Sequence, residues 1–118
     1  MLLKAARRDK RIRISRRSQN GGIVAASQDA VDMALGEFVV LLDHDDLLHS
    51  EALLAVDQRL QTDPTIDYLY TDEDKIDNNG NHYDVFKKPS FDPLRLAGQN
   101  YCCHLSVFRS TLLDQIGG

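Results

Sequence analysis

The hydrophobic and polar positions of this chain follow a strand period and a helix period in turn, which predicts an α/β domain. Residues 11–15 (RIRIS) alternate polar and apolar side chains as a strand does. Apolar residues then recur at helical spacing through residues 23–35, and Gly36 is suited to close that helix. Residues 37–42 (EFVVLL) form an apolar run, which is typical of a strand that is buried on both faces.

The second half of the chain repeats this alternation. Ser50 is a suitable N-cap for a helix, and Pro64 lies beyond the end of that helix. Residues 66–71 (IDYLYT) predict another strand, and residues 77–80 (DNNG) predict a turn. Residues 83–93 predict an extended segment, and residues 92–97 predict a short helical turn. Residues 103–108 predict a strand, and residues 110–116 predict the last helix.

Alternating strands and helices indicate a mostly parallel sheet flanked by helices, within one domain that spans residues 1–118. Three of the predicted strands end at polar clusters, which read RRSQNGG, DHDD and DEDK. In a parallel sheet the carboxyl ends of the strands share one edge, where open α/β sheets bind their ligands. We therefore expect these three clusters to converge.

Composition and charge narrow the class of protein. The chain has 118 residues, of which 42% are apolar and 27% charged, so it is typical of one globular domain. Its net charge of -4 argues against nucleic-acid binding, although residues 4–17 are basic. No apolar stretch approaches the roughly 20 residues that span a bilayer, and no signal peptide is evident, so we expect a cytoplasmic protein.

Asp43, Asp45 and Asp46 are the candidate metal-binding residues. Carboxylates this close in sequence repel one another unless a positive charge lies among them. Mg²⁺ and Mn²⁺ prefer carboxylate oxygens and often share them with a substrate phosphate. The segment Asn20–Gly22 precedes a predicted helix, whose first N–H groups are suited to bind an anion. Together these features favour a metal–diphosphate site over a surface loop.

A second acidic group and a histidine are further candidates. Asp72, Glu73 and Asp74 are expected either to form a solvated loop with local ion pairs or to contact an acceptor hydroxyl and assist the metal. His104 lies in a strand-like apolar run, where it is either structural or able to reach a metal at the carboxyl edge.

Two other kinds of site can be compared with the sequence. A calcium-binding EF-hand loop would place Lys75 and Phe86 at its first and twelfth positions, where carboxylates are required, so this reading fails. A phosphotransferase of the haloacid-dehalogenase type would use Asp43 as nucleophile and Asp45 as acid/base. That family expects Thr or Val where this chain has Leu47.

Four segments of the chain resemble the family 2 glycosyltransferases of the GT-A fold, especially those that build bacterial surface polysaccharides. They read NGGIVAASQDAVDMALGEFVVLLDHDDLL, DYLYTDEDKID, FKKPSFDP and NYCCHLSVFRSTLLDQIGG. The resemblance implies that Asp43 and Asp45 form the D-x-D motif that binds the sugar diphosphate and its Mg²⁺ or Mn²⁺ ion, with Asn20, Gly21 and Gly22 beside the nucleotide. Asp72, Glu73 and Asp74 would then lie near the donor sugar or the acceptor.

The implied reaction is inverting transfer of a sugar from a nucleoside-diphosphate sugar to a hydroxyl of a growing glycan or lipid-linked acceptor. It would take place in the cytoplasm, at the inner face of the membrane.

Members of that family also open with a further strand and continue into an acidic segment that supplies the catalytic base. We therefore expect this chain to be a truncated catalytic domain with its base beyond Gly118 and weak activity of its own. An exposed sheet edge would invite pairing with another copy. The alternative is a non-catalytic remnant that binds metal or nucleotide, or only self-associates.

Overall fold

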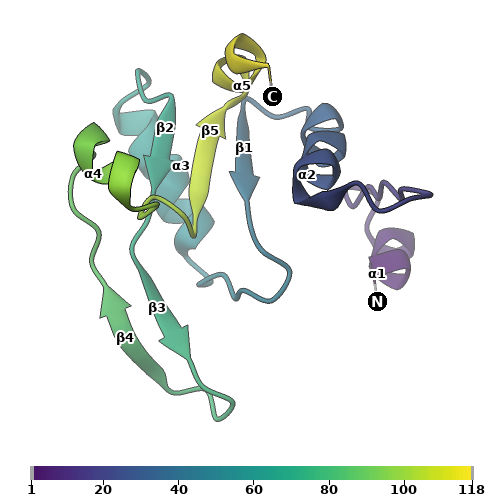
Figure 1. Cartoon of the computed structure of the whole chain (residues 1–118). Helices are drawn as coiled ribbons and strands as arrows, with labels where there is room; N and C mark the ends of the chain where they lie inside the picture. The colour runs from purple at the N-terminus through teal and green to yellow at the C-terminus, as the bar shows by residue number, and fades with distance from the viewer. Residues whose placement is uncertain (1, 118) are drawn as a thin grey trace.

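The computed structural model describes residues 2–117, which contain helices, a three-stranded sheet and a separate β-hairpin (Figure 1). Met1 and Gly118, the ends of the predicted domain, lie outside the described residues. The mixture of helices and strands confirms the predicted α/β class. None of the described helices is long and apolar enough to cross a bilayer.

The sheet contains β1 (Phe38–Leu41), β2 (Tyr68–Tyr70) and β5 (Ser106–Arg109), with β5 in the centre. Both outer strands pair antiparallel with β5, so the prediction of a mostly parallel sheet is wrong for the strand pairs of the described residues. The reason is that the last strand of the chain returns between the first two. β1 and β2 nevertheless point the same way, so their carboxyl ends share the edge at which β5 begins (Figure 1).

The predicted strand at residues 11–15 is also wrong. This segment has neither helical nor strand structure and is exposed, and its Ile12 and Ile14 lie beside a hollow that residues of the next helix also line. Alternating polarity is not sufficient for a strand, because the backbone N–H and C=O groups also need a partner strand. Within residues 2–117 no strand pairs with this segment.

One helix covers one face of the sheet and forms the core with it. Helix α3 (Ala52–Thr62) contributes Val56, which packs with Leu105 and Val107. Partly buried residues surround these three: Phe38, Val40, Leu48, Leu60 and Leu69. The predicted cap at Ser50 is wrong, because the helix begins after Glu51, whose backbone N–H donates to His49 Nδ1 at 3.2 Å.

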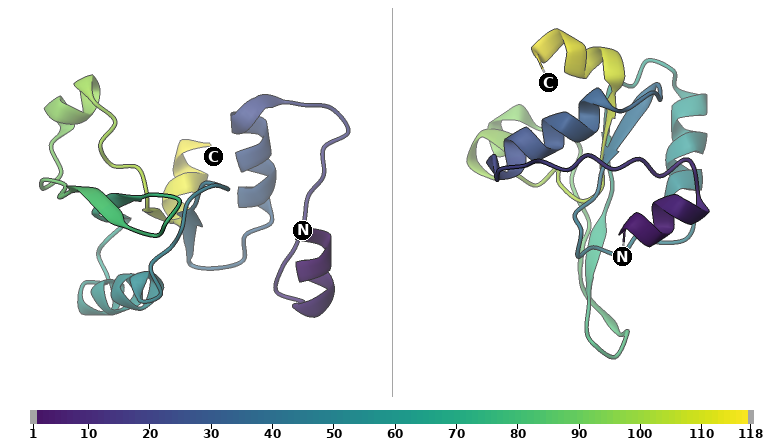
Figure 2. Two further views of the ribbon diagram at one scale, coloured as in Figure 1. Left: turned by 90° about the horizontal axis from the view of Figure 1, so that it is seen from below. Right: turned by 90° about the vertical axis from the view of Figure 1, so that its right-hand side faces the viewer.

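The other helices lie around this centre (Figure 2). Helices α1 (Leu2–Arg8) and α2 (Gly22–Asp32) lie beyond the outer edge of β1 and bury no residue. Helix α4 (Pro93–Gly98) begins at Asp92, whose carboxylate accepts the N–H groups of Leu94 and Arg95. Helix α5 (Ser110–Ile116) follows β5 directly, as predicted.

Strands β3 (Glu73–Ile76) and β4 (His82–Phe86) form an antiparallel hairpin that extends from the end of β2. The sequence predicted its turn but not β3, because a strand with three charged residues in four has no apolar period. In the turn, hydrogen bonds from Asn81 and from backbone N–H groups hold the pKa of Asp77 below its ordinary value. Gly80 has a φ of 84°, which glycine adopts without strain.

Arg109, at the end of β5, fastens the central strand to its surroundings. Its guanidinium contacts the carboxylate of Glu37, donates to Asp67 Oδ1 at 2.8 Å and donates to the carbonyl oxygens of Pro64 and Ile66. It also lies 4.5 Å from the ring centroid of Phe38, and its side chain is only 17% exposed. One side chain therefore joins β1, β5 and the loop before β2.

We predict that Arg109→Ala lowers the free energy of unfolding by roughly 2–4 kcal/mol, because several charge-assisted hydrogen bonds are lost together. Urea denaturation followed by circular dichroism measures this. Arg59→Ala is the matched control: Arg59 makes one exposed pair with Asp63 at 3.5 Å, which should contribute less than about 1 kcal/mol. Equal losses in the two variants would contradict the role given to Arg109.

The hydroxyl of Tyr70 donates to the carbonyl oxygen of Pro89 at 2.6 Å, and burial raises the pKa of Tyr70 from 10.0 to about 12. A raised pKa in the folded state means that the protonated phenol contributes stability. That contribution is complete below about pH 10 and is lost as the pH rises toward 12. We predict that stability falls less steeply over this interval in Tyr70→Phe than in the wild type. Parallel alkaline denaturation curves would contradict this assignment.

Candidate functional site

The candidate site lies at the sheet edge where β1 and β2 end and β5 begins. After β1 the chain makes a turn over residues 43–46, in which the Asp46 N–H lies 3.3 Å from the Asp43 carbonyl oxygen. A turn of this kind brings its first and fourth residues close together. Asp43 and Asp46 therefore present their carboxylates on the same side.

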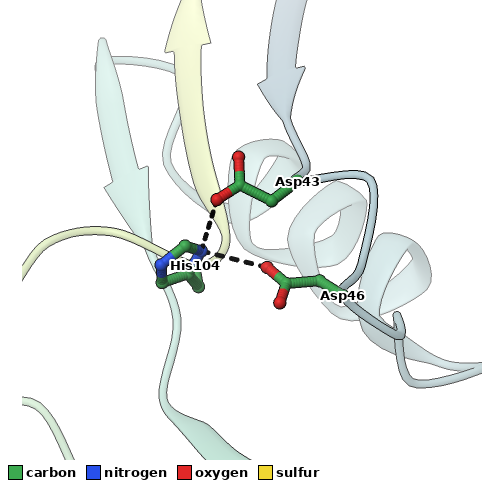
Figure 3. A group of neighbouring side chains, drawn as sticks. All are labelled: Asp43, Asp46 and His104. Carbon is green, nitrogen blue, oxygen red and sulfur yellow. Dashed lines mark ion pairs between the residues drawn. The ribbon is translucent and has the colours of Figure 1, made fainter.

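His104, from the segment before β5, faces these two carboxylates (Figure 3). Its Nδ1 lies 3.0 Å from Asp46 Oδ2 and 3.9 Å from Asp43 Oδ2. The backbone of His104 has a φ of 55°, in the left-handed region that non-glycine residues seldom occupy. The prediction that His104 reaches the carboxyl edge is consistent with this arrangement.

The spacing of these three side chains is compatible with a divalent cation. One ligand atom from each of Asp43, Asp46 and His104 lies within 4.8 Å of the others. Adjacent ligands of an octahedral ion at about 2.1 Å are about 3.0 Å apart, close to the His104–Asp46 separation. Carboxylate oxygen suits Mg²⁺ and Mn²⁺, and imidazole favours the transition metals. The described residues therefore offer a set of ligands that could hold a metal ion.

Asp45, the second acid of the predicted D-x-D motif, is not part of this group. It lies near the middle of the turn, its side chain is 77% exposed, and its carboxylate lies 3.5 Å from His44 Nδ1. Asp46 is only 39% exposed and takes the place beside Asp43 that the motif gave to Asp45. In an extended segment Asp43 and Asp45 would be neighbours on the same side. In the turn, the neighbouring carboxylates are those of Asp43 and Asp46.

A cavity of about 510 Å³ opens beside the group, between the loop after β1 and the hairpin. Asp45, Asp46 and His104 line it from one side. The predicted donor or acceptor residues Asp72, Glu73 and Asp74 also line it. The structure therefore brings together two of the three polar clusters that the sequence predicted to converge.

Each residue of the second acidic cluster has a polar partner, and two of them share Lys88. Asp72 accepts the backbone N–H of Lys88 at 2.7 Å, and Asp74 lies 2.9 Å from His82 Nδ1. Glu73 lies 2.9 Å from the ammonium of Lys88. These partners come from outside residues 71–75, so the choice between a solvated loop and contacts with an acceptor or metal remains a prediction.

The third cluster, Asn20–Gly22, is not among the residues that line this cavity. Asn20 Oδ1 accepts the N–H of Gly22 at 2.9 Å, which occupies one of the donors at the start of α2. The predicted role of Asn20, Gly21 and Gly22 in binding the nucleotide remains a prediction.

The sequence did not show the pairing of Asp46 with Asp43, and it did not point to Lys88 at all. Asp46 belonged to the acidic cluster, but only the turn pairs it with Asp43. Lys88 lies in a segment with no periodic pattern, and its side chain, 1% exposed, is almost completely buried. Buried lysines carry no signature in a single sequence, because lysine is usually exposed.

Comparison with known proteins identifies the family. The family model for glycosyl transferase family 2 matches residues 1–117. This chain belongs to glycosyl transferase family 2. The resemblance seen in the sequence is thereby confirmed, and a phosphotransferase that uses Asp43 as nucleophile has no support.

Curated relatives agree with this assignment. The O-antigen biosynthesis protein RfbC of Myxococcus xanthus is 35% identical over 118 residues, and an uncharacterised glycosyltransferase of Methanocaldococcus jannaschii is 28% identical over 106 residues. The uncharacterised protein y4gI of Sinorhizobium fredii is 41% identical over 112 residues. The match to RfbC covers 100% of this chain but 9% of the relative, and the match to y4gI covers 95% and 12%. The match to the Methanocaldococcus glycosyltransferase covers 90% of this chain and 37% of that relative.

The ligand set generates a test that separates two neighbouring aspartates. We predict that Asp46→Asn weakens Mn²⁺ binding by about 10- to 100-fold, because it removes a charged ligand. Asp45→Asn, a matched change one residue away, should have a smaller effect. Isothermal titration calorimetry with MnCl₂ measures both variants. A larger loss in Asp45→Asn would restore the ligand set that the D-x-D motif predicted.

Proposed function

We propose that this chain forms the donor-binding part of a metal-dependent, inverting glycosyltransferase. The donor would be a nucleoside-diphosphate sugar, and the acceptor a hydroxyl of a growing glycan or lipid-linked glycan. The observation that carries the proposal is the convergence of Asp43, Asp46 and His104 beside the acidic cavity, in a chain that belongs to glycosyl transferase family 2.

Electrostatics explains why a metal is needed. Five carboxylates line the cavity, together with one lysine, Lys75. This excess of negative charge would repel a diphosphate unless a cation lay between them. In the proposal, Asp43, Asp46 and His104 hold Mg²⁺ or Mn²⁺. The bound ion supplies Lewis-acid stabilisation for the diphosphate as it departs.

The other residues have roles on the two sides of the donor. Asp45 faces the cavity and would contact the sugar diphosphate, and it remains the alternative metal ligand. Asp72, Glu73 and Asp74 form the opposite wall, beside the donor sugar or the acceptor. The proposal assigns the catalytic base to no described residue. Its predicted position beyond Gly118 remains a prediction.

The second candidate function is a remnant that binds metal and nucleotide without transferring sugar, or only self-associates. The sheet order favours self-association, because β1 and β2 each have one edge without a partner strand among the described residues. Light scattering during size-exclusion chromatography measures the oligomeric state. The cytoplasmic location at the inner membrane face that the family resemblance implies also remains a prediction.

We predict that UDP, used as a probe, binds at least about tenfold more tightly in the presence of Mn²⁺, because the ion neutralises the cavity. Calorimetry of the wild type with and without MnCl₂ measures this. Asp43→Asn should abolish the enhancement, whereas Asp57→Asn on the exposed side of α3 should retain it. Equal UDP affinity with and without metal would contradict the proposed site.

Turnover separates the two candidate functions. Release of UDP from UDP-sugars by the purified chain, lost in Asp43→Asn, would identify an enzyme. Metal-dependent UDP binding without turnover would identify the remnant.

A further inference from the structure

Lys88 is the one buried cation next to the candidate site among the described residues, and the proposed chemistry does not use it. Its side chain is only 1% exposed, although Lys87 beside it is exposed. Lysine is rarely buried unless its ammonium is fully paired, because removing the charge from water is costly. The partners of Lys88 therefore indicate which parts of the structure the buried ammonium keeps in place.

The ammonium of Lys88 has two hydrogen-bond acceptors and one ion-pair partner. It donates to the carbonyl oxygen of Cys103, and it donates to the carbonyl oxygen of His104 at 2.9 Å. Glu73 Oε2 lies 2.9 Å from the ammonium as an ion pair, without a hydrogen bond between them. Two of the three partners are thus consecutive backbone groups that carry His104.

This arrangement bears directly on the ligand group. The His104 imidazole faces Asp43 and Asp46 from a backbone with a left-handed φ of 55°. A residue in that region stays there only when its surroundings constrain it. The carbonyl oxygens on both sides of the His104 Cα–N bond are fixed by the same ammonium.

Lys88 also connects the ligand group to the opposite wall of the cavity. Its backbone N–H donates to Asp72 Oδ1 at 2.7 Å, while its side chain pairs with Glu73. One residue therefore sets the separation between the hairpin and the segment before β5.

We propose that Lys88 is a positioning residue, whose buried ammonium holds the His104 backbone so that the imidazole faces Asp43 and Asp46. The effect of Lys88 on metal binding rests on the proposed function. Its effect on the position of His104 does not. The inference predicts that Lys88 acts on the metal site without contacting the metal, the donor or the acceptor.

The first test observes His104 in the full chain without metal. In ¹⁵N-histidine-labelled protein at one fixed pH, Lys88→Met should shift or broaden the ring signals of His104, assigned by their absence in His104→Gln. The signals of His44 and His49 should remain in place. Lys87→Met is the matched control and should change none of them. Unchanged His104 signals in folded Lys88→Met would overturn the inference.

The second test measures Mn²⁺ affinity by calorimetry. Lys88→Met should weaken binding by about tenfold, as expected when the support of a metal ligand is removed. Lys87→Met should leave it unchanged. A wild type that fails to bind Mn²⁺, with His104 signals still shifted in Lys88→Met, would refute the proposed function and leave the inference standing. Normal Mn²⁺ affinity together with unshifted His104 signals in Lys88→Met would refute the inference and leave the proposed function standing.

A double variant separates positioning from stability. Lys88→Met alone leaves the Glu73 carboxylate without its cation and is expected to lower the unfolding midpoint. Glu73→Gln combined with Lys88→Met removes both charges, so the midpoint should recover. The His104 signals should stay shifted, because the carbonyl oxygens of Cys103 and His104 still lack their donor. Recovery of both the midpoint and the His104 signals would show that Lys88 is merely structural.

Discussion

The central position of β5 is the constraint on which the fold and the candidate site both depend. The strand lies between β1 and β2, and each of its ends is held by a cation with little exposure to solvent. Lys88 fixes the backbone just before β5, and Arg109 fixes its last residue to the neighbouring segments. If either cation is lost, the strand keeps its sheet hydrogen bonds but loses its anchor at one end.

These two anchors matter because the hydrophobic core is small. Among the described residues, the buried apolar side chains are few: Val39, Val56, Tyr101, Cys102, Leu105 and Val107. At about 25 cal/mol per Å² of buried apolar area, so few side chains contribute modestly to stability. Charge-assisted hydrogen bonds, each about 1.5–3 kcal/mol, therefore carry a large share of the specificity of the fold. The bonds of Lys88 also hold two residues of the cavity lining, Glu73 and His104.

The sequence predicted the elements better than their pairing. Most predicted helices and strands are present, because hydrophobic period is a local property of the chain. The antiparallel insertion of β5 was missed, since parallel and antiparallel neighbours can have the same apolar pattern. The segment at residues 11–15 was misassigned for a related reason: a strand also needs a partner. In the site, the sequence identified the acidic cluster and His104, whereas the pairing of Asp46 with Asp43 depends on a turn and the role of Lys88 depends on its burial.

The charge distribution around the cavity favours one order of binding under the proposed function. Two carboxylates and a histidine lie close together, and Asp72, Glu73 and Asp74 form the opposite wall. The buried ammonium of Lys88 is already held by Glu73 and by two backbone carbonyl oxygens, so it is not free to neutralise an incoming diphosphate. An anionic donor would therefore meet net negative charge until a divalent cation occupies the Asp43–Asp46–His104 group. Because the attraction between the donor and the site depends on that ion, the metal must bind before the nucleotide sugar or together with it.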